Sequence, residues 1–323
     1  MSLAVGVLMD AIGTIKPYKD STFAMLLEAQ RRGHTLWYAT QGDLWLDGGE
    51  ARARLAPLRV QDDKARPFEL DPPQSMPMHR LDVVLARKDP PFDSQFLYDT
   101  MVLEHAARKG VLVVNDPRAL RDANEKLFAL QFPHCIPQTR VARDPALLRE
   151  FVQEVGEAVI KPLDGMAGRS IFRTARDDPN LNVILETLTR EGRELAMAQQ
   201  YLHEIALGDK RILLIDGEPV PYALARIPQG SDFRGNLARG SKGVGQPLSE
   251  RDRWICAQVA PELKRRGLLF VGLDVIGDWL TEINVTSPTG IRELDAQFGL
   301  NISALLFDAI ERMRAARGGP APP

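Results

Sequence analysis

Hydrophobic and polar positions follow two alternating patterns in the first third of the chain. Short apolar runs, typical of buried strands, are separated by segments whose apolar residues recur at helical spacing. The first such segment has a helix start at Asp20 or Ser21 and a stop at Gly33. The alternation predicts a parallel sheet covered on both faces, and the segment 47–78, which lacks a clean period, is expected to be irregular. Strands are expected at 4–9, 35–39, 81–87 and 111–115, and helices at 21–32 and 94–109.

The pattern changes after Pro117, which places a domain boundary near residue 122. A mixed α+β unit is expected next, with helices at 124–131, 145–155 and 180–190 and strands at 138–142, 158–163, 170–173 and 195–202. Two hairpins, at 211–227 and 268–285, and helices at 250–266 and 302–315 are expected beyond it. We therefore predict three domains at 1–122, 123–202 and 203–317, a glycine-rich lid loop at 228–246, and a disordered tail at 318–323.

The charge balance limits the possible partners. The 41 Lys and Arg residues are offset by 43 Asp and Glu residues, which leaves a formal net charge of −2 without an extended basic run. Such a chain offers no field that would attract nucleic acid or an anionic membrane surface. No apolar stretch is long enough to span a bilayer, and the N-terminal run that stops at Asp10 lacks the features of a signal peptide.

Cysteine and histidine usage excludes other classes of site. Cys135 and Cys256 lie far apart in apolar surroundings and lack metal-ligand spacing. Free buried thiols in a reducing compartment are the best interpretation, so a cytoplasmic location is expected. The five histidines share no spacing with one another or with a nucleophile, which argues against a zinc site or a catalytic triad.

Three oxygen-bearing side chains are expected to converge in the second hairpin. Glu282 and Asn284 are two positions apart on an expected strand and therefore point to the same face. A tight turn near residue 277 folds Asp274 back beside them. Hard oxygen ligands in this number suit Mg²⁺ or Mn²⁺ rather than zinc. An exposed polar face is the alternative, which the strongly apolar flanking residues disfavour.

A glycine-rich turn at 164–170 follows Lys161 and has the composition of a phosphate cradle. An ordinary hairpin turn also needs glycine, so both interpretations stay open. The turn lacks the third glycine and the following helix of a dinucleotide-binding fingerprint. The segment 235–242 resembles a P-loop but reverses the order of its lysine and serine, which excludes that motif.

Several cations stand near expected strand ends. A solvated face explains most such residues, but Arg211 and Arg226 lie in apolar strands, where a guanidinium fork can grip a carboxylate or phosphate. The segment 87–91 follows a parallel strand at its carboxyl end, where open α/β sheets bind ligands, although a proline-stiffened turn explains it equally well. The cations in this set are Lys126, Lys161, Lys210, Arg211, Arg226 and Arg234.

Long motifs occur in a consistent order along nearly the whole chain. They read VLMDAIGTIKPYKDSTFAMLLEAQRRGH, RKDPPFD, NEKLFA, KPLDGMAGRSIFR, AMAQQYL, GDKRILLIDGEPVPYALARIPQG, RGNLARG and FVGLDVIGDWLTEINVTSPTGIREL. Together they resemble the bacterial glutathione synthetase family of ATP-grasp ligases. The resemblance implies an ATP-grasp fold with an N-terminal Rossmann-like domain, a central lobe and a C-terminal lobe, with ATP held between the two lobes.

The resemblance also implies roles for individual residues. It places lysines at the ATP phosphates, a small glycine loop over them, a hinge beside the adenine, and magnesium or manganese on the three oxygen ligands already considered. The implied ATP-binding residues are Lys126, Lys161, Gly165, Met166, Gly168, Gln199, Tyr201, Leu202 and Asp209, and the implied metal ligands are Asp274, Glu282 and Asn284. The implied catalytic residues are Arg211, Arg226, Arg234 and Asn236, and the implied substrate-side residues are Arg87, Asp89 and Ser287.

The implied reaction joins γ-glutamylcysteine to glycine. ATP would phosphorylate the cysteinyl carboxylate, and the glycine amine would attack the acyl phosphate to give glutathione, ADP and phosphate. This chemistry needs positioning and charge stabilisation rather than a protein nucleophile. The resemblance further implies a mobile catalytic loop at 234–243 and a homotetramer.

Two departures and three alternatives accompany this interpretation. Ala167 stands where a glycine is expected, and the lid sequence differs from the family's usual one, which bears on loop closure rather than on the chemistry. Another ATP-grasp carboxylate–amine ligase is the nearest alternative. A non-catalytic ATP-binding regulator is disfavoured because the metal-ligand candidates and both strand arginines are retained. A nicotinamide dehydrogenase is disfavoured because no spaced glycines follow the strand 4–9.

Overall fold

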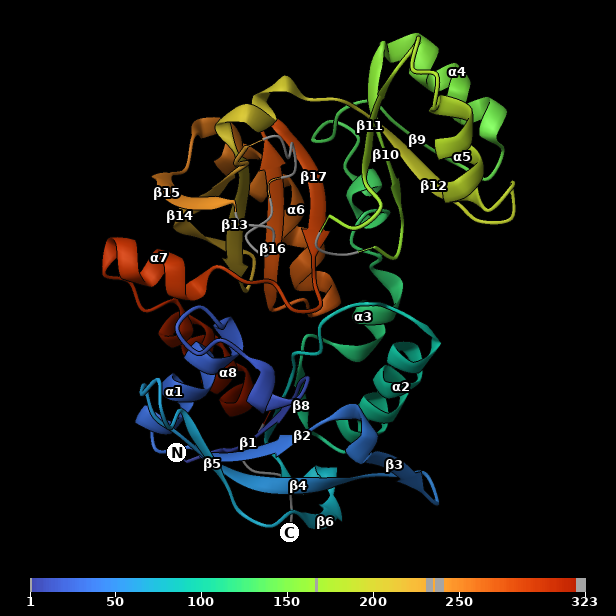
Figure 1. Ribbon diagram of the computed structural model, residues 1–323. Coiled ribbons are helices and arrows are strands. Elements are labelled where there is room, and N and C mark those ends of the chain that lie inside the picture. Colours follow the sequence, from blue (N-terminus) through green and yellow to red (C-terminus); the bar gives the residue numbers. More distant parts are fainter. Residues whose placement is uncertain (1, 166–167, 231–234, 236–240, 318–323) are drawn as a thin grey trace.

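The computed structural model describes residues 2–165, 168–230, 235 and 241–317, whose strands form three sheets (Figure 1). The first sheet has the order β3-β4-β2-β1-β7-β8, and β5 and β6 also pair with β4. Its strands are β1 (Ala4–Leu8), β2 (Thr35–Ala39), β3 (Leu44–Asp47), β4 (Glu50–Val60), β5 (Phe68–Leu70), β6 (Gln74–Pro77), β7 (Val83–Ala86) and β8 (Leu112–Val114). The helices of this part are α1 (Ser21–Arg31), α2 (Ser94–Arg108) and α3 (Pro117–Asp122).

The centre of this sheet is parallel and covered on both faces, as the alternation predicted. β2, β1, β7 and β8 run parallel to one another. Val5 and Val7 pack in the core that contains residues of α1, whereas Leu8 packs in the core that contains Leu103 of α2. Successive residues of β1 therefore face opposite helical layers, which is the pattern of a strand buried on both sides.

The expectation of an irregular segment at 47–78 is wrong. Most of it is the long strand β4 with its antiparallel partners β3, β5 and β6. Ala51, Ala53 and Leu55 are buried, while Arg52 and Arg54 between them are not. Alanine is only weakly hydrophobic, so its alternation with arginine was not recognised as the period of a strand.

The second sheet is antiparallel and has the order β11-β10-β12-β9. Two helices pack on this sheet, and the sheet and helices form a hydrophobic core separate from those of the other sheets. This core includes Leu148, Phe151, Ile160 and Leu185. The strands are β9 (Thr139–Ala142), β10 (Glu157–Pro162), β11 (Phe172–Ala175) and β12 (Ala196–Gln200), and the helices are α4 (Pro145–Val155) and α5 (Leu181–Thr189).

The helix expected at 124–131 is wrong in extent. Only Phe128–Gln131 form a short 3₁₀ turn. The Asn124 side chain accepts hydrogen bonds from the backbone N–H groups of Lys126 and Leu127, which holds a turn in place of a helical start.

The third sheet is antiparallel and has the order β15-β14-β13-β16-β17. A turn with positive φ at Asp216 and Gly217 joins β13 to β14, as expected for an Asp-Gly hairpin. The strands are β13 (Asp209–Ile215), β14 (Glu218–Ile227), β15 (Lys242–Pro247), β16 (Phe270–Ile276) and β17 (Trp279–Asn284), and the helices are α6 (Glu250–Arg266), α7 (Ile291–Phe298) and α8 (Ile302–Ala316).

Two features of this sheet differ from expectation. The end of the predicted lid loop is the edge strand β15, which pairs with β14. Gly245 lets β15 lie against the Phe298 ring, since a Cβ there would approach a ring carbon at 2.2 Å. α7, which carries Phe298, was not expected at all. The expected tail at 318–323 lies outside the described residues.

The C-terminal helix returns to the N-terminal sheet. In Figure 1, α8 lies beside α1, and residues of both helices share one core with β1 and β7. Arg32 at the end of α1 donates to the backbone oxygen of Ala304 at 2.9 Å and pairs with Asp308 at 2.8 Å. The first and third sheets are thereby held against each other. No described helix is both long and apolar enough to cross a bilayer.

The contact between α1 and α8 predicts a pH-dependent stability. The His34 side chain is buried, its Nδ1 accepts from the Leu3 N–H at 3.2 Å, and its Nε2 lies 3.1 Å from Glu311. Burial lowers the pKa of His34, so the folded protein favours the neutral ring. The unfolded chain binds the proton more readily, and stability should decrease as the pH falls through and below about 6.5.

Urea unfolding at about pH 7.5 and about pH 5.5 measures this effect. His34→Gln keeps an acceptor and a donor but cannot titrate, so we expect it to lose part of the pH dependence. His134→Gln, a change at an exposed histidine, is the control. An unaltered pH dependence in His34→Gln would contradict the assignment.

Candidate active site

A cavity of about 540 Å³ lies where the three sheets meet. It is lined by residues of all three parts, and every described residue to which the family resemblance gave a role lines it. These residues are Arg87, Asp89, Lys126, Lys161, Gly165, Gly168, Gln199, Tyr201, Leu202, Asp209, Arg211, Arg226, Asp274, Glu282, Asn284 and Ser287. The candidate cation Lys210 does not line the cavity, because its ammonium group pairs with Asp252 and donates to the Gly277 oxygen. The predicted residues Met166, Arg234 and Asn236 lie outside the described residues.

The register of the third sheet places charged side chains in a row. Arg211 of β13 lies opposite Asp274 of β16, which in turn lies opposite Glu282 of β17. On the other side of β13, Asp209 lies opposite Arg226 of β14. Directly opposite positions on neighbouring strands project to the same face, so the hydrogen-bonding register alone gathers these charges.

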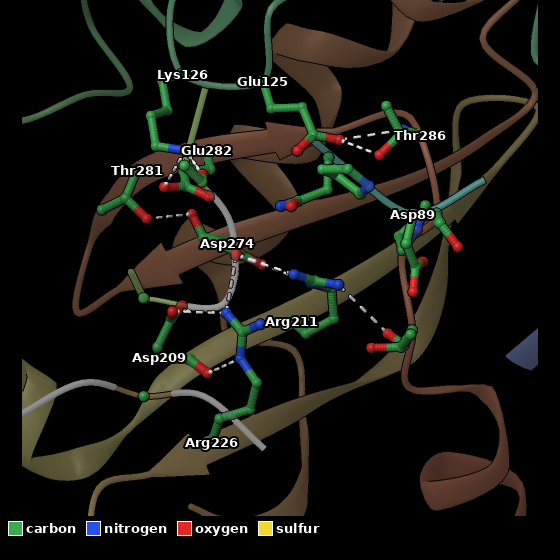
Figure 2. Close-up of a pocket in the computed structure, with 18 of the residues that line it drawn as sticks. Asp89, Glu125, Lys126, Asp209, Arg211, Arg226, Asp274, Thr281, Glu282 and Thr286 are labelled. Carbon is green, nitrogen blue, oxygen red and sulfur yellow. Dashed lines mark hydrogen bonds and ion pairs between the residues drawn. The ribbon is translucent and has the colours of Figure 1, made fainter. Parts of the chain in front are cut away.

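Asp274 is at the centre of this row (Figure 2). Its Oδ2 lies 3.0 Å from Nη2 of Arg211 and 2.9 Å from Nη2 of Arg226, and the residue is only 4% exposed. Burial by itself would raise the pKa of Asp274, but the charges of the two arginines outweigh it and hold that pKa well below its usual range. Asp274 is therefore ionised and holds both guanidinium groups in place.

Arg226 also pairs with Asp209, with 2.6 Å between Nη2 and Oδ2. Burial raises the pKa of Asp209 to about 7, although Arg226 opposes the shift. Gly235, one of the described residues of the predicted catalytic loop, lies directly over this pair. A Cβ at Gly235 would approach the Arg226 carbonyl oxygen at 2.7 Å, so only glycine fits there.

A second charged group lies beside the first. The ammonium groups of Lys126 and Lys161 lie 3.5 and 3.4 Å from Oε1 of Glu282. Lys126 also donates to the carbonyl oxygen of Gly165 at 2.7 Å. Burial lowers the pKa of Lys161, and the two lysines together lower that of Glu282 against the effect of burial. Two buried cations beside a glycine-rich turn suit a polyphosphate.

The donor set fits a hard divalent cation. Asp274 and Glu282 are cross-strand partners, and Asn284 lies on the same face two residues further along β17. Asn284 donates through Nδ2 to the Gly272 oxygen at 3.3 Å, which anchors its amide group. No group of three His, Cys, Asp or Glu residues gathers closely enough to hold a metal within the described ranges. A metal here would therefore need ligands from the nucleotide as well.

The part of the cavity beyond the two lysines is largely apolar. Its lining residues are Val159, Ile171, Gln199, Tyr201 and Leu202. The sequence motifs had indicated Gln199, Tyr201 and Leu202 but not Val159 or Ile171. Gln199 is held by Thr139, whose Oγ1 lies 3.1 Å from its Nε2, and its Oε1 accepts from Lys161 at 3.2 Å. An apolar slot beside strand-end polar groups suits a purine base.

The far end of the cavity is lined by residues of the N-terminal part and α7. Arg87 is 5% exposed, donates to Thr22 at 3.0 Å and to the Pro288 oxygen at 2.8 Å, and lies over the Phe270 ring. Burial lowers the pKa of Arg87 to about 10. No carboxylate among the described residues lies within ion-pair distance of this guanidinium. It is available to an anionic ligand.

The sequence motifs had not indicated four acidic residues that line the cavity, namely Asp10, Asp20, Glu125 and Glu293. Asp20 was considered only as a helix cap, which it is, since it accepts from the Phe23 N–H at 2.7 Å. One oxygen of Glu293 is buried without a hydrogen-bond partner. Glu125 stands next to the predicted Lys126 in the NEK motif, and that adjacency is the one signal that would have drawn attention to it.

Comparison with known proteins identifies the family. Residues 3–121 match the family model described as prokaryotic glutathione synthetase, N-terminal domain, and residues 125–299 match the model of the same family's ATP-grasp domain. The chain belongs to the prokaryotic glutathione synthetase family. The family resemblance and the ATP-grasp fold predicted from the motifs are therefore confirmed.

Curated relatives of this family are similar over almost their full length. The glutathione synthetase of Xanthomonas campestris pv. campestris is 65% identical over 311 residues, which cover 96% of this chain and 98% of the relative. The glutathione synthetase of Pseudomonas aeruginosa is 59% identical over 317 residues, which cover 98% of this chain and 100% of the relative.

Solved structures share the fold at low sequence identity. D-cycloserine synthetase matches with a TM-score of 0.68 and 17% identity, covering 96% of this chain and 100% of its own. D-alanyl-alanine synthetase A from Vibrio cholerae matches with a TM-score of 0.57 and 12% identity, covering 98% and 99%. The ATP-grasp fold is thus common to members of this family and to more distant ligases.

The central ion pairs predict a large effect of Asp274→Asn. The substitution leaves two buried guanidinium groups without their shared charge, which should lower the free energy of unfolding by about 3–5 kcal/mol and abolish most activity. Asp308→Asn breaks the ion pair with Arg32 at a side chain that is 58% exposed, and should cost less than about 1 kcal/mol. Urea unfolding of both variants checks the difference, and similar losses would contradict it.

Proposed function

We propose that this cavity joins γ-glutamylcysteine to glycine at the expense of ATP, giving glutathione, ADP and phosphate. The observation that carries the proposal is the convergence of Lys126, Lys161, Arg211 and Arg226 on one cavity in a chain of this family. Four buried cations with only partial compensation suit substrates that bring phosphate and carboxylate groups. The relatives are named glutathione synthetases, and the matching family model is that of an ATP-grasp domain.

The reaction proceeds through an acyl phosphate. The cysteinyl carboxylate attacks the γ-phosphorus of ATP and displaces ADP, and the glycine amine then attacks the acyl carbon and displaces phosphate. Lys126 and Lys161 contact the phosphates, while Arg211 and Arg226 stabilise the charge on the transferring group. The two arginines are already held by Asp274, so they need little reorganisation during the reaction.

We propose that Asp274, Glu282 and Asn284 hold Mg²⁺ or Mn²⁺ together with ATP. When bound, the ion neutralises charge on the phosphate oxygens. The support is the shared face of these three side chains and their hard oxygen donors.

The substrate end suits a zwitterionic dipeptide. Arg87 offers a buried guanidinium to a carboxylate, beside Asp89 and Ser287, which line the same end. Glu293 offers a carboxylate oxygen without a partner, and we propose that it accepts from the free ammonium of the γ-glutamyl group. The cavity thus matches both charges of that group.

Further proposals concern the whole molecule. The three domains at 1–122, 123–202 and 203–317 each contain all the described strands of one sheet, which supports that division. A cytoplasmic location is supported by Cys135 and Cys256, which are buried free thiols. A homotetramer is proposed from the family resemblance, and light scattering of the purified protein tests it.

ADP release in the presence of Mg²⁺, ATP and γ-glutamylcysteine, with and without glycine, tests the reaction. We expect glycine-dependent release and glutathione as the product by mass spectrometry. Release with a different amine only would retain the ligase chemistry and refute the substrate assignment. Absence of ADP with every amine would refute the activity.

Glu293→Gln tests the recognition of the ammonium. We expect kcat/KM for γ-glutamylcysteine to fall by about tenfold or more, because a charged hydrogen bond is lost. The des-amino analogue glutarylcysteine should be a poor substrate of the wild type and should be affected little by the substitution. Asp295→Asn, on the same helix α7 but outside the cavity lining, is the control. Equal losses for both substrates would contradict the assignment.

A further inference from the structure

The segment Asn124-Glu125-Lys126 joins the first part of the chain to the second and contacts the active site on two sides. Asn124 donates through Nδ2 to the Leu163 oxygen at 3.1 Å, and Lys126 donates to the Gly165 oxygen at 2.7 Å. Both contacts hold the glycine-rich turn after β10. Glu125, between them, points the other way, to the end of β17 (Figure 2).

Glu125 binds the chain at the end of β17 through several hydrogen bonds. Its Oε1 accepts from the N–H groups of Val285 and Thr286 at 3.0 and 3.1 Å and from the Thr286 hydroxyl at 2.9 Å. Its backbone oxygen accepts from the Ile283 N–H at 2.9 Å. On the carbonyl side, Asn115 donates to the Val285 oxygen at 2.7 Å.

These hydrogen bonds take the place of those that a neighbouring strand would make. β17 is the edge strand of its sheet, so its outer N–H groups have no ladder partner. Val285 and Thr286 are buried just beyond the strand end, where an unsatisfied N–H group is costly. Glu125 supplies the acceptors there. Burial raises the pKa of Glu125, while its hydrogen bonds to Thr286 and the charge of Lys126 oppose the shift.

We propose that Glu125 is a positioning residue of the reaction, which holds residues 283–286 so that Asn284 stays beside Glu282 and Ser287 stays at the substrate end. Asn284 lies within the segment that Glu125 holds and Ser287 follows that segment, while Lys126 follows Glu125 directly in the chain. Glu125 therefore links the proposed metal ligand Asn284 and substrate-side residue Ser287 to Lys126, which we propose contacts the phosphates. The inference rests on the proposed function for the identity of those ligands.

The test compares Glu125→Ala, Glu125→Gln and the wild type for binding of Mn²⁺ in the presence of ADP, measured by electron paramagnetic resonance of free Mn²⁺. Glu125→Ala should bind Mn²⁺ at least about tenfold more weakly and lose kcat, as expected when a supporting residue of a metal site is removed. Glu125→Gln keeps a carbonyl oxygen at the position of Oε1, so it should restore most of both properties.

Glu28→Ala is the matched control, because Glu28 is also buried and accepts hydrogen bonds from Arg31, Arg32 and Asn301, but lies outside the cavity. It should lower the melting temperature without weakening Mn²⁺ binding. If Glu125→Ala does not fold, Thr286→Val removes one of the bonds, and it should weaken binding by a smaller factor.

The outcomes separate the inference from the proposed function. Mn²⁺ binding by Glu125→Ala equal to that of the wild type would overturn the inference and leave the function intact. A Glu125→Gln variant as impaired as Glu125→Ala would also overturn it, since the charge rather than the position would then matter. A wild type that does not retain Mn²⁺ with ADP would refute the metal assignment, and the inference with it.

Discussion

Burial of several charges in one cavity is the constraint on which the rest of the structure depends. An isolated buried charge is costly, so the arginines and lysines at the centre of the cavity face opposite charges at close range, whereas Arg87 has hydrogen bonds to Thr22 and Pro288 instead. Asp274 meets this condition for two arginines at once, and Glu282 meets it for two lysines. The strand register brings these charges together, and the lack of a Cβ at Gly235 lets the backbone lie close to Asp209 and Arg226.

The three parts contribute different groups to the cavity. The third sheet supplies the row of charges, and a sheet is suited to this because its register is fixed by many backbone hydrogen bonds. The second sheet supplies Lys161 and the apolar slot, and it has a core of its own. The first sheet supplies Arg87 at the far end of the cavity, where the guanidinium donates to the Pro288 oxygen.

Catalysis in such a cavity depends on electrostatics that exist before the substrate arrives. Arg211 is held by Asp274 and Arg226 by both Asp274 and Asp209, so the cations keep their directions in the free protein. Preorganised charges stabilise a developing negative charge more effectively than water, which must reorient. Among the described residues that line the cavity there is no histidine or cysteine, which agrees with this type of chemistry.

Elements with local signals could be predicted from the sequence. α4 and α6 have the bounds that the sequence predicted, and the structure shows each with its own caps, Asp144 for α4 and Ser249 with Gly267 for α6. The shared face of Glu282 and Asn284 follows from the period of a strand. The tertiary structure alone decided that β4 is a strand, that Asp209 partners Arg226, and that Glu125 and Glu293 reach the cavity. These features depend on partners remote in the chain and on desolvation, and neither is encoded in the spacing of neighbouring residues.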